Sequence, residues 1–166
     1  MAIVSVNPAT GKTLETYDEM TPVQAAATVV HAHEAWLEWR AVPFSMRAQL
    51  MKRAAEILRE RKGELARLMA AEMGKPLKQG VAEAEKCAWV CDYYADNAEA
   101  QLAPEVVNTD ASRSYVAFQP IGVVLAVMPW NFPLWQVYRF AAPALMAGNV
   151  GVLKHASNVP GCALAI

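Results

Sequence analysis

The sequence IGVVLAVMPWNFPLWQVYRFAAPALMAGNVGVLK, residues 121–154, changes its pattern twice along its length. Its first eight residues, 121–128, are continuously apolar and rich in β-branched side chains, which is typical of a strand buried on both faces. Residues 134–149 have helical spacing that ends at Gly148, and residues 150–154 form a second apolar run. Strand, helix and strand with short connections predict a right-handed βαβ unit, so the expected fold class is α/β.

Polar residues follow each predicted strand at its carboxyl end, which is where ligands bind in such sheets. Asn131 comes after the first strand, and its neutral amide can donate hydrogen bonds to a developing oxyanion. It can equally be a loop asparagine that bonds its own backbone. Lys154 ends the second strand, where its charge has to reach a partner or water. A ribose hydroxyl, a phosphate or plain solvent would each serve.

The helix between the strands carries a tryptophan and an arginine on one face. Trp135 and Arg139 are four residues apart, and Asn131 lies near the start of the same helix. An arginine placed there can grip a carboxylate through two parallel hydrogen bonds. The alternative is a structural ion pair.

The first 103 residues are predicted to form a hairpin followed by helices. Residues 3–17 alternate around the turn NPATGK. Thr21 as N-cap and Pro22 at the first helical position begin a helix. A second helix starts near Ser45 and continues to Gly74, a suitable residue for a left-handed end. Its predicted stripe is Leu50, Ala54, Ile57, Leu58 and Arg61.

A third helix is expected from about residue 77 to residue 102. Small and apolar residues recur along it at steps of three and four, which predicts a packing face: Val81, Ala84, Ala88, Cys91, Ala95, Ala98 and Leu102. Cys87 and Cys91 are four apart and could be half of a metal site. No second half is present in the sequence, so we expect core cysteines and no metal.

Residues 104–120 change to an alternating pattern around NTDAS, which predicts a β-hairpin. A two-stranded ribbon is marginal by itself. We therefore expect it to pair with another chain or another domain, which points to a homo-oligomer, a dimer or a tetramer.

Composition excludes several classes of protein. The net charge of −1 gives no reason to expect nucleic acid or an anionic membrane as partner. Residues 114–138 carry no charge, but three prolines interrupt them, so a membrane span is rejected. Three cysteines cannot all pair, which favours a reducing cytoplasm. Hydrophobic content of 55% is high for a small free-standing domain and indicates part of a larger or oligomeric protein.

The segment NVPGCALAI, residues 158–166, begins a helix without a C-terminal signal. Two parallel strands do not make a stable doubly wound sheet. We therefore expect the chain to be the amino-terminal portion of a longer protein and to be inactive by itself.

Four segments and their order resemble the aldehyde dehydrogenase superfamily: NPATGK (7–12), EMGKP (72–76), QPIGVVLAVMPWNFP (119–133) and APALMAGNVGVLK (142–154). The resemblance covers the whole chain, and the run of segments looks most like the bacterial succinate-semialdehyde dehydrogenases. It implies the amino-terminal part of a Rossmann-like nicotinamide-binding domain. Residues 1–103 would be its hairpin and helices, 104–120 the hairpin of an oligomerisation arm, and 121–166 the first βαβ of the cofactor-binding sheet.

The resemblance also implies roles for individual residues. Asn131 matches the asparagine whose amide helps to form the oxyanion hole. Arg139 matches the arginine that holds the substrate carboxylate in the semialdehyde branch, and Trp135 would lie one turn away in the substrate channel. The residues that match cofactor-binding positions are Met128, Pro129, Trp130, Asn131, Lys154, His155, Ala156 and Ser157, of which Lys154 would contact the adenosine ribose.

Ser157 departs from many NAD-preferring relatives, which commonly have a glutamate there that binds the ribose hydroxyls. Without that carboxylate a 2′-phosphate is not repelled, so the expected cofactor is NADP or NAD, with NADP tolerated. The family's nucleophilic cysteine and general-base glutamate lie downstream of this segment, and Cys162 is no substitute for the former.

The implied reaction is NAD(P)-dependent oxidation of a small aldehyde through a cysteine thiohemiacetal and thioester in the complete protein. The preferred substrate is succinate semialdehyde, with another aliphatic aldehyde as the alternative. From a different class, the chain could be a non-catalytic fragment or an interaction module.

Overall fold

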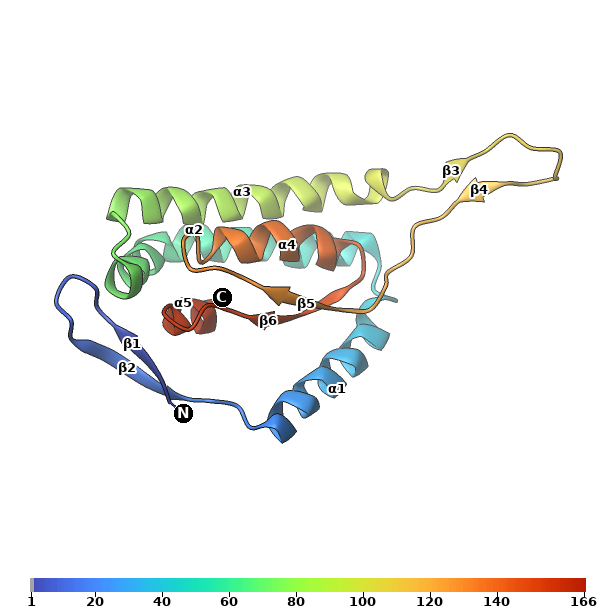
Figure 1. Ribbon diagram of the computed structural model, residues 1–166. Helices are drawn as coiled ribbons and strands as arrows, with labels where there is room; N and C mark the ends of the chain where they lie inside the picture. The colour runs from blue at the N-terminus through green and yellow to red at the C-terminus, as the bar shows by residue number, and fades with distance from the viewer. Residues whose placement is uncertain (1) are drawn as a thin grey trace.

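The computed structural model describes residues 2–166, which form five helices and six short strands. Four layers follow one another in Figure 1: the long helices α2 and α3, then α4, then the strands β5 and β6, then α1. In chain order the elements are β1 (Ala2–Val6), β2 (Thr13–Asp18), α1 (Pro22–Trp39), α2 (Phe44–Met73), α3 (Leu77–Gln101), β3 (Glu105–Val106), β4 (Tyr115–Val116), β5 (Val123–Val127), α4 (Trp135–Met146), β6 (Val150–Lys154) and α5 (Pro160–Ala165).

The expected βαβ unit is present. β5 and β6 pair in parallel from Val123 opposite Val150 to Val127 opposite Lys154, and α4 connects them. The chain leaves α4 through Gly148, whose φ of 85° lies in the left-handed region that favours glycine. The α/β fold class predicted from the sequence is therefore confirmed.

One face of β5 differs from the prediction of a strand buried on both sides. Ala126 is buried against the α4 side, but Leu125 and Val127 are each 65% exposed. α1 contacts both strands but leaves these two side chains exposed. Among the described residues, β5 and β6 are the whole of this sheet.

The core lies between α2, α3 and α4. Cys87 and Cys91 have no exposed surface and belong to it, as the sequence predicts. The other buried hydrophobic members of this cluster are Met51, Ala55, Leu58, Leu65, Met69, Ala84, Ala88, Val90, Ala98, Leu134, Ala142, Met146, Val159 and Cys162.

The buried stripe of α2 is rotated from the predicted one. Leu50 is 54% exposed and Ile57 37% exposed, whereas Met51, Ala55 and Leu58 are buried. The core therefore contains Met51 and Ala55, each one residue after a predicted position. Leu58 alone belongs to both the predicted and the observed stripe. This part of the prediction is wrong because a mostly polar helix with scattered leucines fits more than one apolar stripe.

The α2–α3 contact is close at one glycine. A Cβ at Gly80 would lie 2.9 Å from both Cα and Cβ of Ala66. The two helices, which lie side by side in Figure 1, approach each other there because Gly80 has no side chain. No pattern in the sequence predicts this role for Gly80.

The amino-terminal hairpin, β1 with β2, is tied to the rest of the molecule by one buried carboxylate. Glu72, near the end of α2, accepts hydrogen bonds from the Ser5 hydroxyl at 2.7 Å and from the backbone N–H groups of Gly161 and Cys162, both at 2.8 Å. The same side chain thus satisfies free N–H groups at the start of α5 and holds β1 beside it.

The second hairpin, β3 with β4, extends away from the body in Figure 1. Its apolar side chains are open to solvent: Val106 is 84% exposed and Val116 46% exposed. The β3–β4 hairpin lies within residues 104–120, where the sequence predicts a ribbon. Its role in an oligomerisation arm stays a prediction.

Within residues 2–166, no helix has the length and apolar character needed to cross a membrane. The same residues contain no cluster of three or more side chains of the types that bind metal ions.

Candidate functional site

The carboxyl ends of the two parallel strands bring two predicted site segments together. Val127 lies opposite Lys154 in the strand pair, and the N–H of Met128 donates to the carbonyl of Lys154 at 3.0 Å. The segments 128–131 and 154–157 therefore leave the same edge of the sheet side by side. Of their side chains, Pro129, Trp130, Asn131, Lys154 and Ser157 are exposed, and Met128 and Ala156 are partly buried.

Asn131 has a fixed backbone and an open side chain. Its carbonyl accepts a hydrogen bond from the ammonium of Lys75 at 3.0 Å. Its side-chain amide is exposed and has no hydrogen-bond partner in the described part of the chain, its own backbone included. The alternative of an asparagine that bonds its own backbone does not apply in this structure.

Glu83, in the second turn of α3, holds the start of α4. Its Oε1 accepts the backbone N–H groups of Leu134 and Trp135, both at 2.9 Å. The first N–H groups of a helix lack partners within the helix, and a carboxylate at this end also interacts favourably with the helix dipole. The loop that carries Asn131 is thereby joined to α3.

Lys75 and Glu83 form an ion pair with almost no exposure. Their side chains are 5% and 1% exposed. The Lys75 ammonium also lies 4.0 Å from the centre of the Phe132 ring, a cation–π contact. Lys75, which follows Gly74 in the link between α2 and α3, thus contacts both Asn131 and its neighbour.

His155 lies between the two segments and is buried. The N–H of Ala156 donates to Nδ1 at 2.8 Å, so Nε2 carries the ring proton and donates to the carbonyl of Pro133 at 2.8 Å. Both ring nitrogens are used within the protein. A contact from this residue to a cofactor would have to come from its backbone.

A groove of about 370 Å³ opens between α3 and the start of α4. Phe132 and Trp135 form one side of it, and the Lys86 ammonium lies 4.0 Å from the centre of the Trp135 ring. The other residues of the groove, all on α3, are Gln79, Ala82 and Glu83. An aromatic ring with a cation beside it suits a small ligand that has both an apolar chain and a negative charge.

Arg139 is exposed on α4, one turn beyond Trp135. No carboxylate of residues 2–166 lies within ion-pair distance of its guanidinium. The structural ion pair that the sequence left open is therefore not formed within the described chain, and the side-chain donors of Arg139 have no hydrogen-bond partner there.

The thiols near this region are not nucleophiles. Burial raises the pKa of Cys91 to about 12, and burial also raises that of Cys87. The pKa of Cys162 is raised by burial and by its contact with Glu72. Thiols of this kind remain protonated and inert at neutral pH.

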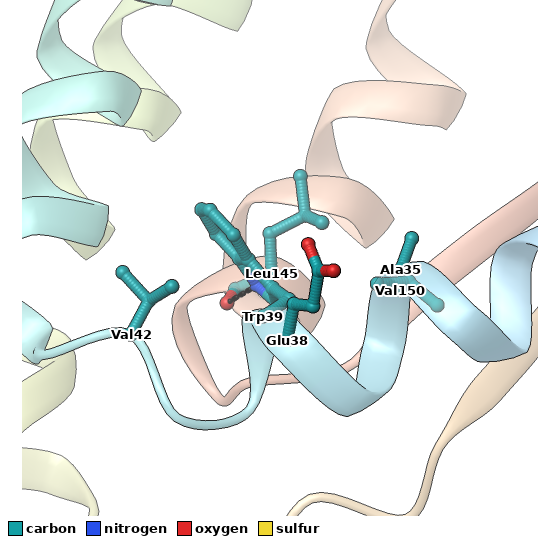
Figure 2. Close-up of a pocket in the computed structure, with 6 residues that line it drawn as sticks. All are labelled: Ala35, Glu38, Trp39, Val42, Leu145 and Val150. Carbon is teal, nitrogen blue, oxygen red and sulfur yellow. Dashed lines mark hydrogen bonds between the residues drawn. The ribbon is translucent and has the colours of Figure 1, made fainter.

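A second cavity, of about 400 Å³, lies at the other end of the sheet (Figure 2). Trp39 of α1 donates its indole N–H to the carbonyl of Leu145 at 2.9 Å, and Val150, the first residue of β6, completes the wall. Because ligands bind beyond the carboxyl ends of parallel strands, this cavity at the amino end of β6 is not the candidate site.

No motif in the sequence predicts a role for Lys75, Glu83 or Lys86. Glu83 directly precedes Ala84, which is on the predicted packing face of α3. A carboxylate beside this apolar stripe was the one local signal that Glu83 could be buried. Lys75 lies in EMGKP, one of the four segments that resemble the aldehyde dehydrogenase superfamily, but the sequence offers no physical reason for a lysine at this position. The backbone groups that Lys75 and Glu83 bond in the loop before α4 and at its start lie 51 to 56 residues away along the chain, so no local pattern reveals these contacts.

Comparisons with known proteins agree with this fold. Residues 1–166 match the model of the aldehyde dehydrogenase family. The chain is 59% identical over 166 residues to a Synechocystis sp. protein named "Probable succinate-semialdehyde dehydrogenase (NADP+)", and 52% identical over 168 residues to the succinate-semialdehyde dehydrogenase (NADP+) of Mycobacterium avium. These alignments cover 100% and 99% of the chain, and 37% and 36% of the two relatives.

Among solved structures, the succinic semialdehyde dehydrogenase of Streptococcus pyogenes, crystallised with NADP+ as its cofactor, superposes with a TM-score of 0.94 at 37% identity. The alignment covers 99% of this chain and 36% of that one. The chain thus spans little more than a third of the length of the relatives it matches. The match to the family model over residues 1–166 shows that the chain belongs to the aldehyde dehydrogenase family.

Proposed function

We propose that this chain supplies the cofactor-side strand pair and one oxyanion donor to an NADP-dependent dehydrogenase that oxidises succinate semialdehyde to succinate. The observation that carries the proposal is the state of Asn131. Its backbone is fixed by Lys75, and its amide is exposed without a protein partner at the ligand-binding edge of the sheet. Preorganised donors of this kind stabilise charge that develops in the transition state.

In the proposed reaction, a cysteine thiolate from elsewhere in the complete protein attacks the aldehyde carbon. The carbonyl oxygen becomes an oxyanion, and the Asn131 amide donates to it. The C–O double bond then re-forms as the hydride on that carbon is expelled, which leaves a thioester; NADP+ would supply the hydride acceptor when it is bound. Water hydrolyses the thioester, which releases the carboxylic acid and returns the thiol.

The residues at the strand ends fit a nicotinamide dinucleotide that carries a 2′-phosphate. Lys154 and Ser157 are both exposed beside the segment that contains Asn131, and residues 154–157 include no carboxylate. A lysine and a serine hydroxyl can both donate to a phosphate, and no negative charge repels it. The relatives named above for NADP+ support this choice over NAD.

Arg139 and Trp135 suit the substrate end of the reaction. An arginine with free donors binds a carboxylate through two parallel hydrogen bonds, and the Trp135 ring can cover the short carbon chain. The names of the relatives support succinate semialdehyde over an uncharged aliphatic aldehyde.

The experiment is an assay of aldehyde oxidation with the complete protein and its Asn131→Ala variant. Wild-type protein should reduce NADP+ with succinate semialdehyde, and the variant should lose about 10²–10³-fold in kcat, as when one oxyanion donor is removed. Asn97→Ala is the matched control, because that amide bonds the Tyr93 carbonyl on α3. A wild-type protein without this activity, or an Asn131→Ala protein with near-normal kcat, would contradict the proposal.

The β3–β4 hairpin supports a homo-oligomer as part of the same proposal. Its two-residue strands stand clear of the body, and Val106 is the most exposed of its apolar side chains. Pairing with a second copy would bury this ribbon. Light scattering of the complete protein should give the mass of a dimer or tetramer, and Val106→Lys should lower that mass. A monomer for both the wild type and Val106→Lys would exclude a role of the hairpin in assembly.

A further inference from the structure

We propose that the buried Lys75–Glu83 pair is a positioning device that sets where the Asn131 amide lies. The inference rests on the proposed function, because it takes Asn131 as an oxyanion donor. Neither residue is assigned contact with the reacting atoms. They act through the backbone of the loop that carries Asn131.

The two side chains hold that loop at successive points. Lys75 donates to the carbonyl of Asn131 at 3.0 Å and covers the ring of Phe132 at 4.0 Å. Glu83 accepts the N–H groups of Leu134 and Trp135 at 2.9 Å. The contacts fix the residues on the carboxyl side of Asn131 and its own carbonyl, and they leave its side chain free to turn toward a ligand.

Both anchors belong to elements outside the sheet. Lys75 comes from the link between α2 and α3, and Glu83 comes from α3 itself. Gly74, with φ of 73°, ends α2 in the left-handed conformation from which the chain continues to Lys75. The position of Asn131 is therefore set against the rigid pair of long helices and not only by the end of β5.

The buried ion pair of Lys75 and Glu83 is not needed for packing alone. Two charges that are nearly out of contact with water pay a desolvation penalty, and a well-packed apolar pair often stabilises a protein more. What an apolar pair cannot do is bond the Asn131 carbonyl and two N–H groups at once. The specific advantage of this pair is that it holds the loop that carries Asn131 in one geometry.

The gain matters because oxyanion stabilisation is sensitive to distance. Donors have to lie about 2.7–3.1 Å from the place that the oxyanion will occupy. A displacement of about 1 Å can cost about 10²-fold in rate. Release of the Asn131 carbonyl would allow displacements of this size without removing the amide.

The test uses the complete protein with Lys75→Met, Glu83→Gln and the double variant, each made with Asn131 intact and with Asn131→Ala. Lys75→Met should lower kcat by about 10²-fold, with the KM values for semialdehyde and NADP+ little changed. Glu83→Gln should be milder, because the remaining amide oxygen can still accept the N–H groups of Leu134 and Trp135. In the Asn131→Ala background, Lys75→Met should cost little more.

The double variant separates positioning from folding. Lys75→Met alone leaves the Glu83 carboxylate buried without its ion-pair partner, which destabilises the fold and adds a folding effect to the measured kcat. The double variant has no unpaired charge and should regain thermal stability, while its kcat should stay low because nothing donates to the Asn131 carbonyl. The matched controls are Lys62→Met and Glu85→Gln, which break an exposed ion pair between the same two helices.

Each result decides the matter. Multiplicative losses from Lys75→Met and Asn131→Ala, or a double variant with restored kcat, would overturn the inference while the proposed function stands. A wild-type protein without NADP+-dependent oxidation, or a normal kcat in Asn131→Ala alone, would overturn the proposed function and the inference with it. A loss that disappears in the Asn131→Ala background, with unchanged controls, would support both.

Discussion

Nε2 of His155 lies 2.8 Å from the carbonyl oxygen of Pro133 and donates its proton to it. This bond joins the segment after β6 to the loop after β5, across the edge at which Asn131 and Lys154 emerge. The two halves of the candidate site therefore cannot move independently. A cofactor bound by one half would be held at a fixed distance from Asn131, the proposed oxyanion donor, on the other half.

Replacement of His155 by phenylalanine should destabilise the complete protein by about 1–3 kcal/mol, because the Ala156 N–H loses its acceptor and the Pro133 carbonyl loses its donor. Urea unfolding would measure the change. His31→Phe, at an exposed position on α1, should stay within about 0.5 kcal/mol of wild type. Equal effects of the two substitutions would contradict this role for His155.

Arg139 is expected to discriminate between aldehydes by charge. Arg139→Ala should lower kcat/KM for succinate semialdehyde by an amount equivalent to about 1.5–3 kcal/mol, the value of hydrogen bonds to a charged group. The same variant should leave kcat/KM for butanal nearly unchanged, and Arg139→Lys should recover part of the loss. Steady-state kinetics with both aldehydes make the comparison, and parallel losses would remove the carboxylate-binding role.

Ser157 is expected to set the choice of cofactor. Ser157→Glu should lower kcat/KM for NADP+, because the new carboxylate repels a 2′-phosphate, and should raise it for NAD+, whose 2′-hydroxyl it can accept a bond from. The ratio of the two values should change by about 10-fold or more, which corresponds to about 1.4 kcal/mol. Asn158→Glu adds the same charge one exposed residue later, and a similar change there would show a general charge effect only.

Two helical glycines should respond oppositely to alanine. Gly63→Ala should stabilise the protein by about 0.5–1 kcal/mol through helix propensity, because the nearest atom to the new Cβ is Arg67 Nη1 at 3.8 Å. Gly80→Ala should destabilise it by about 1–3 kcal/mol, because its Cβ would meet the backbone of Ala66. Thermal or urea unfolding measures both. A stabilising Gly80→Ala would mean that α2 and α3 can separate freely.

Stability should fall at alkaline pH. Burial raises the pKa of Tyr138 from 10.0 to about 12 and that of Cys91 from 9.0 to about 12. The folded state therefore holds these protons more tightly than the unfolded chain, so their contribution is complete below about pH 9 and is lost as pH rises toward 12. Urea midpoints from about pH 8 to about pH 11 would show the fall. Tyr138→Phe should make it shallower, whereas Tyr115→Phe, at an exposed residue, should not.

The sequence is sufficient to predict elements whose signals are local. The Thr21 side chain accepts from the Gln24 backbone N–H at 3.2 Å and caps α1 as predicted, and Gly74 ends α2 with a positive φ. The parallel strands β5 and β6 follow from continuous apolar runs. The family resemblance adds the site residues, among which Asn131 and Lys154 lie on one edge of the sheet.

What the sequence misses depends on partners far away in the chain. Glu72 and Glu83 are charged residues in long helices, where a solvent-facing position is the ordinary expectation. Only the arrival of α5 and α4 turns them into buried caps. The exposure of Leu125 and Val127 cannot be predicted from the sequence either. A continuous apolar run does not show which face of the strand the rest of the chain covers.

The hydrogen bonds of Glu72 also constrain the order of folding. They connect residues separated by 67 positions toward the amino end and by 89 and 90 positions toward α5. Closing loops of this length is entropically costly and slow compared with the local formation of a hairpin. During synthesis β1 and β2 leave the ribosome well before α5 and can pair at once, yet they acquire their full anchor only after α5 has emerged. The β1–β2 hairpin is thus held in place by a helix that is synthesised long after it.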